Sequence, residues 1–191
     1  MVELTIVRHG ETKENVAGIL QGRLPGVLTE KGLQQIAALR DNLEHKQHDF
    51  DVLLVSPLRR AVQTACVLNE VLHLPIKEEP LLQERDWGEL TGHTVAEVRL
   101  IKEMPESVET VEAMFRRART FLDMILAEYN GHRVLAVTHG LFARCIQAAF
   151  YGTTIREIPP MQNTEMRMMK INRVTDGREH GLPTADVVSD K

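Results

Sequence analysis

The fold is decided by the stretch LTIVRHG at residues 4–10, where an apolar run ends abruptly on an arginine and a histidine. The β-branched and apolar residues of this run predict a short strand that is buried on both faces, as in a parallel sheet. In open α/β sheets, ligands bind in the crevice outside the carboxyl ends of the strands. We therefore expect Arg8 and His9 to form a pocket floor, with Gly10 letting the backbone approach a ligand closely.

Two further predicted strands end on cationic side chains. The run DVLLV at residues 51–55 leads into SPLRR at 56–60, and the run VLAV at 134–137 leads into Thr138, His139 and Gly140. Because the carboxyl ends of parallel strands meet at one edge of a sheet, three strand ends should bring cationic groups together there.

Helical patterns alternate with these strands, which predicts βαβ units and a mainly parallel sheet with helices on both faces. Thr29 should cap a helix whose apolar positions include Leu33, and Pro57 should open the first turn of the helix that ends near Leu72. Further expected elements are a brief strand at 75–77, helices at 94–101, 109–129 and 141–150, and an edge strand at 165–174.

Length and composition limit the class of protein. A chain of 191 residues that is 43% hydrophobic predicts a single domain over residues 1–191, with a core at about 2–174 and a tail at 175–191. A net charge of −4 argues against a nucleic-acid or membrane surface built on bulk positive charge. No apolar run approaches the roughly 18 residues of a membrane span, so we expect a cytoplasmic protein. Cys66 and Cys145 are expected to be small buried hydrophobes.

The polar residues near the predicted strand ends suit phosphoryl transfer. The charge on a transferring phosphoryl group lies on its outer oxygens, so cations stabilise it, and arginine offers a planar fork that matches phosphate. Arg8 and Arg60 are the candidates. A neutral imidazole can attack phosphorus and carry the group as phosphohistidine, and neighbouring arginines disfavour the imidazolium form. We assign this role to His9, because it lies beside Arg8 and directly before the glycine turn.

Two more side chains complete this hypothesis. His139 would donate to the phosphoryl oxygens, and Glu84 could protonate the leaving alkoxide and later deprotonate a water molecule. Trp87, three residues further along the chain, could supply an apolar wall beside Glu84. Residues 13–27 are rich in turn formers and should fold over the mouth of the pocket.

Four segments together resemble the histidine phosphatases of the phosphoglycerate-mutase-like superfamily. RHGET at 8–12 is similar to the signature with the phosphorylated histidine, and SPLRRAVQTA at 56–65 resembles the second motif. LQERDWG at 82–88 is similar to the segment with the acid/base glutamate, and THG at 138–140 resembles the second histidine motif. The resemblance covers roughly residues 2–174, and all four segments occur in the family's order.

This resemblance implies a fold and a set of site residues. The fold would be a three-layer α/β/α sandwich with a mainly parallel sheet and one antiparallel edge strand. His9 would be the nucleophile, Glu84 the general acid/base, and Arg8, Arg60 and His139 would bind phosphate. Further phosphate or substrate contacts would come from Asn15, Gln21, Gly22 and Asn163.

The implied activity is hydrolysis of small-molecule phosphate monoesters, which we class with the histidine acid phosphatase type, without a metal or another cofactor. Similar proteins hydrolyse sugar bisphosphates, α-ribazole phosphate and phosphoglycerates. Arg23, Arg85 and Arg99 could bind a second anionic group, and a homodimer is possible. The chain departs from many relatives at Thr91, where they have an acidic residue, and at 106–108, where they often have a glycine-rich turn.

Three alternatives stay open. A cofactor-dependent phosphoglycerate mutase needs a substantial lid that excludes water, and the segment between Glu84 and Glu109, about 25 residues long, is short for one. A binding protein with a degenerate pocket would lack one of the core residues, and none is missing. A metallohydrolase that uses the same histidines would need a closely spaced ligand set, and the sequence has no H-E-x-x-H motif.

Overall fold

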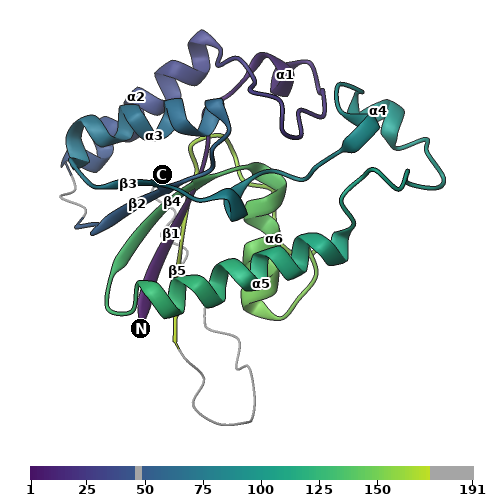
Figure 1. The fold of residues 1–191 in the computed structure, drawn as a ribbon. Coiled ribbons are helices and arrows are strands. Elements are labelled where there is room, and N and C mark those ends of the chain that lie inside the picture. Colours follow the sequence, from purple (N-terminus) through teal and green to yellow (C-terminus); the bar gives the residue numbers. More distant parts are fainter. Residues whose placement is uncertain (46–48, 173–191) are drawn as a thin grey trace.

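One five-stranded sheet forms the centre of the molecule (Figure 1). The computed structural model describes residues 1–45 and 49–172. The strand order is β3-β2-β4-β1-β5, and every neighbouring pair is parallel except β1 and β5. The strands are β1 (Val2–Arg8), β2 (Val52–Val55), β3 (Ile76–Glu78), β4 (Arg133–Thr138) and β5 (Met166–Ile171). The predicted mixed α/β sheet with one antiparallel edge strand is confirmed.

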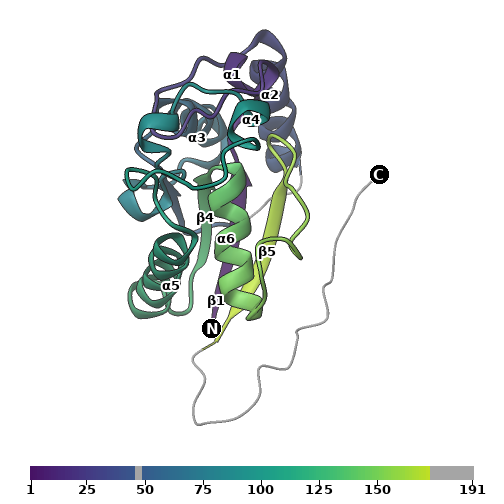
Figure 2. The same cartoon turned by 90° about the vertical axis from the view of Figure 1, so that its right-hand side faces the viewer.

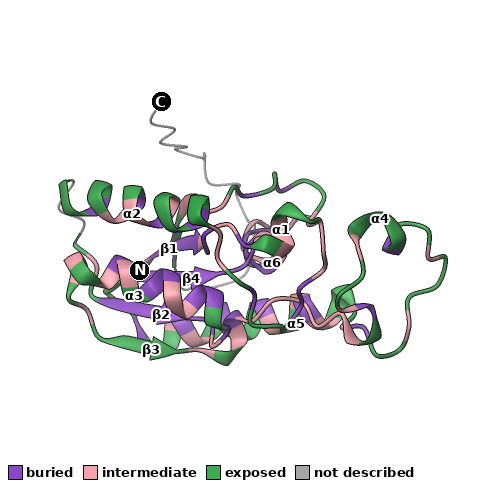
Figure 3. Ribbon diagram, turned by 90° about the horizontal axis from the view of Figure 1, so that it is seen from above, coloured by how far each residue is buried: buried purple, intermediate pink, exposed green. Residues whose placement is uncertain are grey.

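Helices cover both faces of this sheet. Helices α2 (Glu30–His45) and α3 (Arg59–Leu72) lie on one face, and α5 (Val111–Glu128) and α6 (Gly140–Tyr151) lie on the other (Figures 1 and 2). Figure 3 shows the exposed side of α2 turned outward and strands β1, β2 and β4 largely buried, whereas the edge strand β3 is exposed. The short elements are α1 (Lys13–Val16), η1 (Pro80–Leu82), η2 (Gly88–Leu90) and α4 (Val95–Val98).

Strand β1 is buried on both faces, as its sequence predicts. Leu4 and Ile6 pack into the apolar cluster under α5 and α6, whereas Val7 packs into the cluster under α2 and α3. All three side chains are fully buried. Burial of three such side chains stabilises the fold by about 2 kcal/mol each, which explains why this run forms a central strand.

The strand register brings three strand ends level with one another. Arg8 pairs with Thr138 across β1 and β4, and Val55 pairs with Val137 across β2 and β4. The residues that follow these strands therefore emerge at the same edge of the sheet. Helices α1 and α4 and their loops lie beyond this edge (Figure 1).

Gly10 serves packing and not close approach to a ligand, so that expectation was wrong. A Cβ atom at Gly10 would lie 2.7 Å from Cδ1 of Ile36 and 2.9 Å from the carbonyl oxygen of Gly32, both on α2. A Cβ atom at Gly32 would in turn collide with the carbonyl oxygen of Glu11. The two glycines let α2 approach the end of β1, which fixes the backbone beside His9.

Several local expectations also need correction. Cys66 is exposed, because it faces outward on α3, whereas Cys145 is buried. Leu33 on α2 is 51% exposed, although the hydroxyl of Thr29 caps this helix as predicted by accepting from the amide of Gly32 at 2.9 Å. Helix α3 begins at Arg59, after Pro57.

The remaining differences concern the ends of elements. Helix α4 is shorter than the predicted 94–101, since its regular turns stop at Val98. The predicted edge strand at 165–174 is observed as β5 and ends at Ile171. The last two residues of that prediction, 173 and 174, and the predicted tail at 175–191 lie outside the described residues.

Candidate active site

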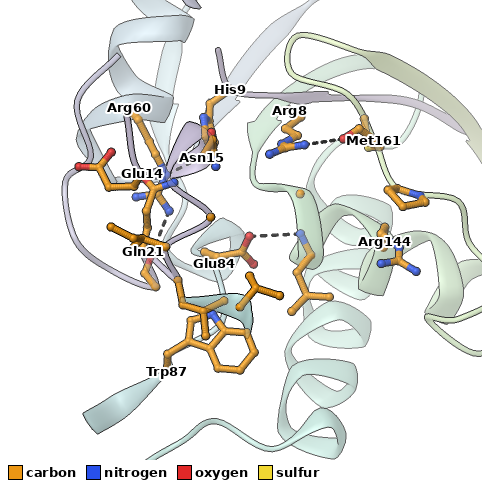
Figure 4. Close-up of a pocket in the computed structure, with 18 residues that line it drawn as sticks. Arg8, His9, Glu14, Asn15, Gln21, Arg60, Glu84, Trp87, Arg144 and Met161 are labelled. Atoms are coloured by element: carbon orange, nitrogen blue, oxygen red, sulfur yellow. Dashed lines mark hydrogen bonds between the residues drawn. The ribbon is translucent and has the colours of Figure 1, made fainter. Parts of the chain in front are cut away.

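A cavity of about 290 Å³ opens beyond the carboxyl ends of the strands (Figure 4). Four of the predicted catalytic residues line it: Arg8, His9, Arg60 and Glu84. They come from three parts of the chain: Arg8 and His9 lie at the end of β1, Arg60 in the first turn of α3 and Glu84 in the loop after η1. The fifth, His139, does not line the cavity, and its ring centroid lies 5.2 Å from that of His9.

The ring of His9 is held in one tautomer. Its Nδ1 lies 2.7 Å from the carbonyl oxygen of Gly10, and the Nε–H of Arg60 donates to its Nε2 at 3.2 Å. An arginine only donates, so Nε2 carries the lone pair and Nδ1 carries the proton. Burial and, after it, the charges of Arg60 and Arg8 hold the pKa of His9 well below its ordinary value. The imidazole is therefore neutral.

Arg60 is almost completely buried, with an exposed fraction of 1%. Its Nη1 donates to the carbonyl oxygen of Leu24 at 2.5 Å, and its Nη2 donates to that of Gly22 at 2.9 Å. Desolvation lowers the pKa of Arg60 to about 10, so it stays cationic at neutral pH. The guanidinium group thus joins the loop before α2 to the His9 ring.

Arg8 provides the second guanidinium group. Its Nη1 donates to the carbonyl oxygen of Met161 at 2.6 Å, whereas its buried Nε has no hydrogen-bond partner among the described residues. Gly140 packs against it, since a Cβ atom there would lie 3.1 Å from the Arg8 Nε. Because a buried donor without a partner is costly, this N–H is available to an anionic ligand.

His139 is fully buried at the end of β4 and is paired with a residue that the sequence analysis did not single out. Its Nε2 lies 2.7 Å from the hydroxyl oxygen of Ser56, at the end of β2, while its Nδ1 has no partner within the described ranges. Burial and then the charge of Arg60 lower the pKa of His139 well below its ordinary value. When Ser56 donates to Nε2, the Nδ1–H of the neutral ring becomes a free donor.

Glu84 is held at the amino end of α6. Its two carboxylate oxygens accept from the amides of Leu141 at 3.2 Å and Phe142 at 3.0 Å, and Oε1 also accepts from the amide of Arg85 at 2.9 Å. A helix N-terminus favours a carboxylate, because its amides lack partners within the helix. Trp87 lines the same cavity, as expected (Figure 4). The Arg85 guanidinium carbon lies 4.3 Å from the Trp87 ring centroid.

Comparison with known proteins adds the family. The sequence profile of the histidine phosphatase superfamily (branch 1) matches residues 4–180. The chain belongs to this superfamily. Phosphatase PhoE of Bacillus subtilis, described as uncharacterized, is 32% identical over 171 residues, which are 87% of this chain and 84% of that protein. The Bacillus stearothermophilus structure named YhfR has a TM-score of 0.82 at 28% identity and covers 91% of this chain and 93% of its own.

Other relatives include both phosphatases and mutases. The metal-independent phosphoserine phosphatase of Arabidopsis thaliana is 32% identical over 172 residues, covering 80% of this chain and 72% of its own. A 2,3-bisphosphoglycerate-dependent phosphoglycerate mutase of Methylobacterium radiotolerans is 29% identical over 180 residues, covering 83% and 84%. These relatives support a phosphatase-type enzyme. Our label of histidine acid phosphatase type was wrong, because that term denotes a different family.

The loop residues implied by the resemblance divide into two groups. In this histidine phosphatase Asn15, Gln21 and Gly22 line the cavity, as residues 13–27 fold over it. Asn163 does not line the cavity. Its side-chain Nδ2 donates to the carbonyl oxygen of His9 at 2.9 Å and to Oδ1 of Asn15 at 3.4 Å. Asn163 thus holds the backbone of His9.

The three arginines considered for a second anionic group are placed elsewhere. Arg23 pairs with Asp86 at 3.3 Å on the surface, Arg85 donates to the carbonyl oxygen of Glu109 at 2.8 Å, and Arg99 is exposed. None of them lines the cavity. Arg144 does, and the sequence analysis missed it, although it lies one helical turn after Gly140 and so on the same side of α6.

Residues 1–45 and 49–172 contain no group of three His, Cys, Asp or Glu side chains arranged to hold a metal ion. In the same part of the chain, no helix combines the length and the apolar character required to cross a membrane.

Proposed function

We propose that this protein is a phosphatase that hydrolyses small-molecule phosphate monoesters through a phosphohistidine on Nε2 of His9. One observation carries the proposal: the neutral His9 ring is held with its Nε2 lone pair toward Arg60, while its Nδ1 proton is engaged by a backbone carbonyl. A nucleophile needs this protonation state, and the developing charge on the phosphoryl group needs the adjacent guanidinium groups. The phosphatases among the relatives support the same reaction class.

In the first step, Nε2 of His9 attacks phosphorus and the bond between phosphorus and the ester oxygen breaks. Arg60 exchanges its contact with Nε2 for a phosphoryl oxygen, and Arg8 and His139 donate their free N–H groups to the other oxygens. The carboxyl group of Glu84 gives its proton to the ester oxygen, so that the alcohol leaves neutral.

In the second step, water attacks the phosphorus of phosphohistidine. The carboxylate of Glu84 takes one proton from this water, the bond between phosphorus and nitrogen breaks, and inorganic phosphate leaves. Glu84 is again protonated and His9 again neutral, so the cycle closes. The same carboxyl group thus serves as acid and then as base.

Access of water favours hydrolysis over transfer to a second hydroxyl. A mutase must shield its phosphohistidine, which requires a lid. Here the segment from residue 85 to 108 contains only η2 and α4, and Val95, at the start of α4, is 39% exposed. We therefore favour the phosphatase over the mutase.

The test is capture of the intermediate. The protein is mixed with a ³²P-labelled phosphate ester and quenched in alkali within one turnover. We expect a label that is stable in alkali and labile in acid, and we expect phosphorus NMR of the digest to assign it to Nε2 of histidine. The His9→Ala variant should carry no label, whereas His132→Ala, at an exposed histidine, should be labelled as the wild type. A label that persists in His9→Ala refutes the proposal.

A further inference from the structure

Arg117 lies on α5, outside the cavity lining, and makes contacts with the loop that carries Glu84. Its Nη1 donates to the backbone carbonyl oxygens of Leu81 at 2.8 Å and Gln83 at 2.6 Å, and its Nη2 reaches the carbonyl oxygen of Glu84 at 3.5 Å. The side chain has an exposed fraction of 13%. One guanidinium group thus binds three carbonyls of a four-residue segment.

Glu109 fixes the orientation of this guanidinium group. Its carboxylate accepts from Nε of Arg117 at 3.0 Å and from Nη2 at 2.8 Å, which is a bidentate pair. The same carboxylate accepts from the amide of Asp86 at 3.1 Å, and the amide of Glu109 donates to the carbonyl oxygen of Asp86 at 2.8 Å. The backbone is therefore held on both sides of Glu84.

Arg117 also contacts Phe142, one of the residues whose amides bind the Glu84 carboxylate. Its guanidinium carbon lies 3.8 Å from the ring centroid of Phe142, and the amide of Phe142 donates to Oε1 of Glu84 at 3.0 Å. A stacked guanidinium group on a buried ring is attractive and directional. Arg117 thus contacts both the backbone of Glu84 and a residue whose amide binds the Glu84 carboxylate.

Other contacts hold parts of this loop: the Leu82 side chain is fully buried, and the Leu82 carbonyl oxygen accepts from the hydroxyl of Thr138 at 2.7 Å. Apart from η1 the loop has no regular structure up to η2. Without Arg117, the carbonyl groups that it binds would lose charged donors in a partly buried place, and the loop would move to satisfy them. A displacement of about 1 Å of a proton donor lowers the rate of proton transfer severely.

We propose that Arg117, oriented by Glu109, is a positioning residue that sets the Glu84 carboxyl group for proton transfer. The inference rests on the proposed function, in which Glu84 protonates the leaving group. Arg117 touches neither the substrate nor the reacting atoms. Its contribution should therefore be visible only where Glu84 is needed.

The dependence on the leaving group separates this role from a general structural one. 4-Nitrophenolate leaves readily without a proton, whereas the alkoxide of glycerol 2-phosphate needs one. The ratio kcat/KM reports steps up to formation of phosphohistidine. For Arg117→Met we expect kcat/KM to fall about 10²-fold with glycerol 2-phosphate and less than about 3-fold with 4-nitrophenyl phosphate, in line with the usual contribution of general acids.

Matched variants control the experiment. Arg119→Met, at an exposed arginine on the same helix, should leave both rates unchanged. Arg117→Lys should recover part of the loss with glycerol 2-phosphate, since it keeps a donor near these carbonyls, and Glu109→Gln should show the same selective loss as Arg117→Met. If the methionine variant fails to fold, the lysine and glutamine variants supply the comparison.

The Glu84→Gln variant distinguishes failure of the positioning role from failure of the proposed function. Glu84→Gln should show the same selective loss. If Glu84→Gln is selective and the Arg117 and Glu109 variants lose both esters equally, or neither, the positioning role is refuted while the proposed function stands. If Glu84→Gln shows no dependence on the leaving group, the role of Glu84 in the proposed function is refuted, and the positioning role with it.

Discussion

Arg60 donates its Nε–H to Nε2 of His9 across 3.2 Å, so that the most buried cation of the site faces the lone pair of its neutral histidine. The opposite ring nitrogen is engaged by the Gly10 carbonyl at 2.7 Å. The ring can neither flip nor pick up a proton without the loss of one of these contacts. The free protein therefore holds His9 ready for nucleophilic attack.

Removal of Arg60 should change both the rate and its pH dependence. In Arg60→Met we expect kcat/KM to fall by about 10²-fold or more, because a charge-stabilising donor is lost. The pKa of His9 should rise, since Arg60 is the main charge that lowers it. The acidic limb of the kcat/KM profile should then move to higher pH. Arg59→Met, at the exposed neighbour, is the control, and an unmoved acidic limb in Arg60→Met would contradict the assignment.

Stability should decrease in mild acid. His9 and His139 stay neutral in the folded protein, because their pKa values lie well below 6.5, whereas in the unfolded chain they bind protons below about pH 6.5. The free energy of unfolding should therefore fall as the pH drops below 6.5, by up to about 1.4 kcal/mol per pH unit for each histidine. Urea unfolding between pH 7.5 and 5.5 measures this.

Two histidine variants, measured in the same way, test this assignment and provide its control. His139→Gln should show a smaller loss of stability between these pH values than the wild type, whereas His132→Gln should not differ from it. An equal pH dependence in the wild type and His139→Gln would show that His139 is not the group that titrates on unfolding.

Substitution of Gly32 should destabilise the protein although it lies on a helix. Alanine normally favours a helix over glycine, but here the added Cβ would collide with the backbone of Glu11, which cannot move aside as a flexible side chain could. We expect Gly32→Ala to lower the free energy of unfolding by about 1–3 kcal/mol. Gln34→Ala, at an exposed position of the same helix, should be nearly neutral. A stabilised Gly32→Ala would show that α2 can shift away from β1.

We expect transfer of the phosphoryl group from His9 to phosphoglycerate to be slow. When 2,3-bisphosphoglycerate is added to load His9, interconversion of 2- and 3-phosphoglycerate should remain slower than the release of inorganic phosphate, since the short segment after Glu84 does not exclude water. Phosphorus NMR of the reaction mixture measures both rates at once. Interconversion well above phosphate release would favour the mutase.

The sheet and much of the cavity follow from local sequence. Buried runs such as residues 4–7 and 134–137 predict parallel strands, and parallel strands have only one edge at which Arg8, His9 and His139 can meet. The resemblance then places Arg60 and Glu84, which the cavity contains. Exposure on single helix faces is less predictable, as Cys66 and Leu33 show, because an apolar residue at the border of the buried stripe can face water.

The contacts that hold the site were missed because they depend on the packing of distant segments. Arg117 is a charged residue at the border of the apolar stripe of α5, Glu109 lies just before this helix, and charged side chains at such positions are usually solvated. Only the tertiary fold brings the loop at residues 81–86 against them. One sequence signal could have indicated that Arg117 is partly buried: it directly precedes Ala118 and follows Met114 by three positions, and both of these residues are buried.

A small third apolar cluster, formed by Leu90, Val98 and Val108, supports the outer wall of the cavity. Leu20 and Trp87 pack against it, and both line the cavity. This cluster is separate from the two that enclose the sheet. Substitutions in this third cluster can thus change which ester fits the cavity. They leave the phosphate-binding side chains and the two clusters that enclose the sheet unchanged.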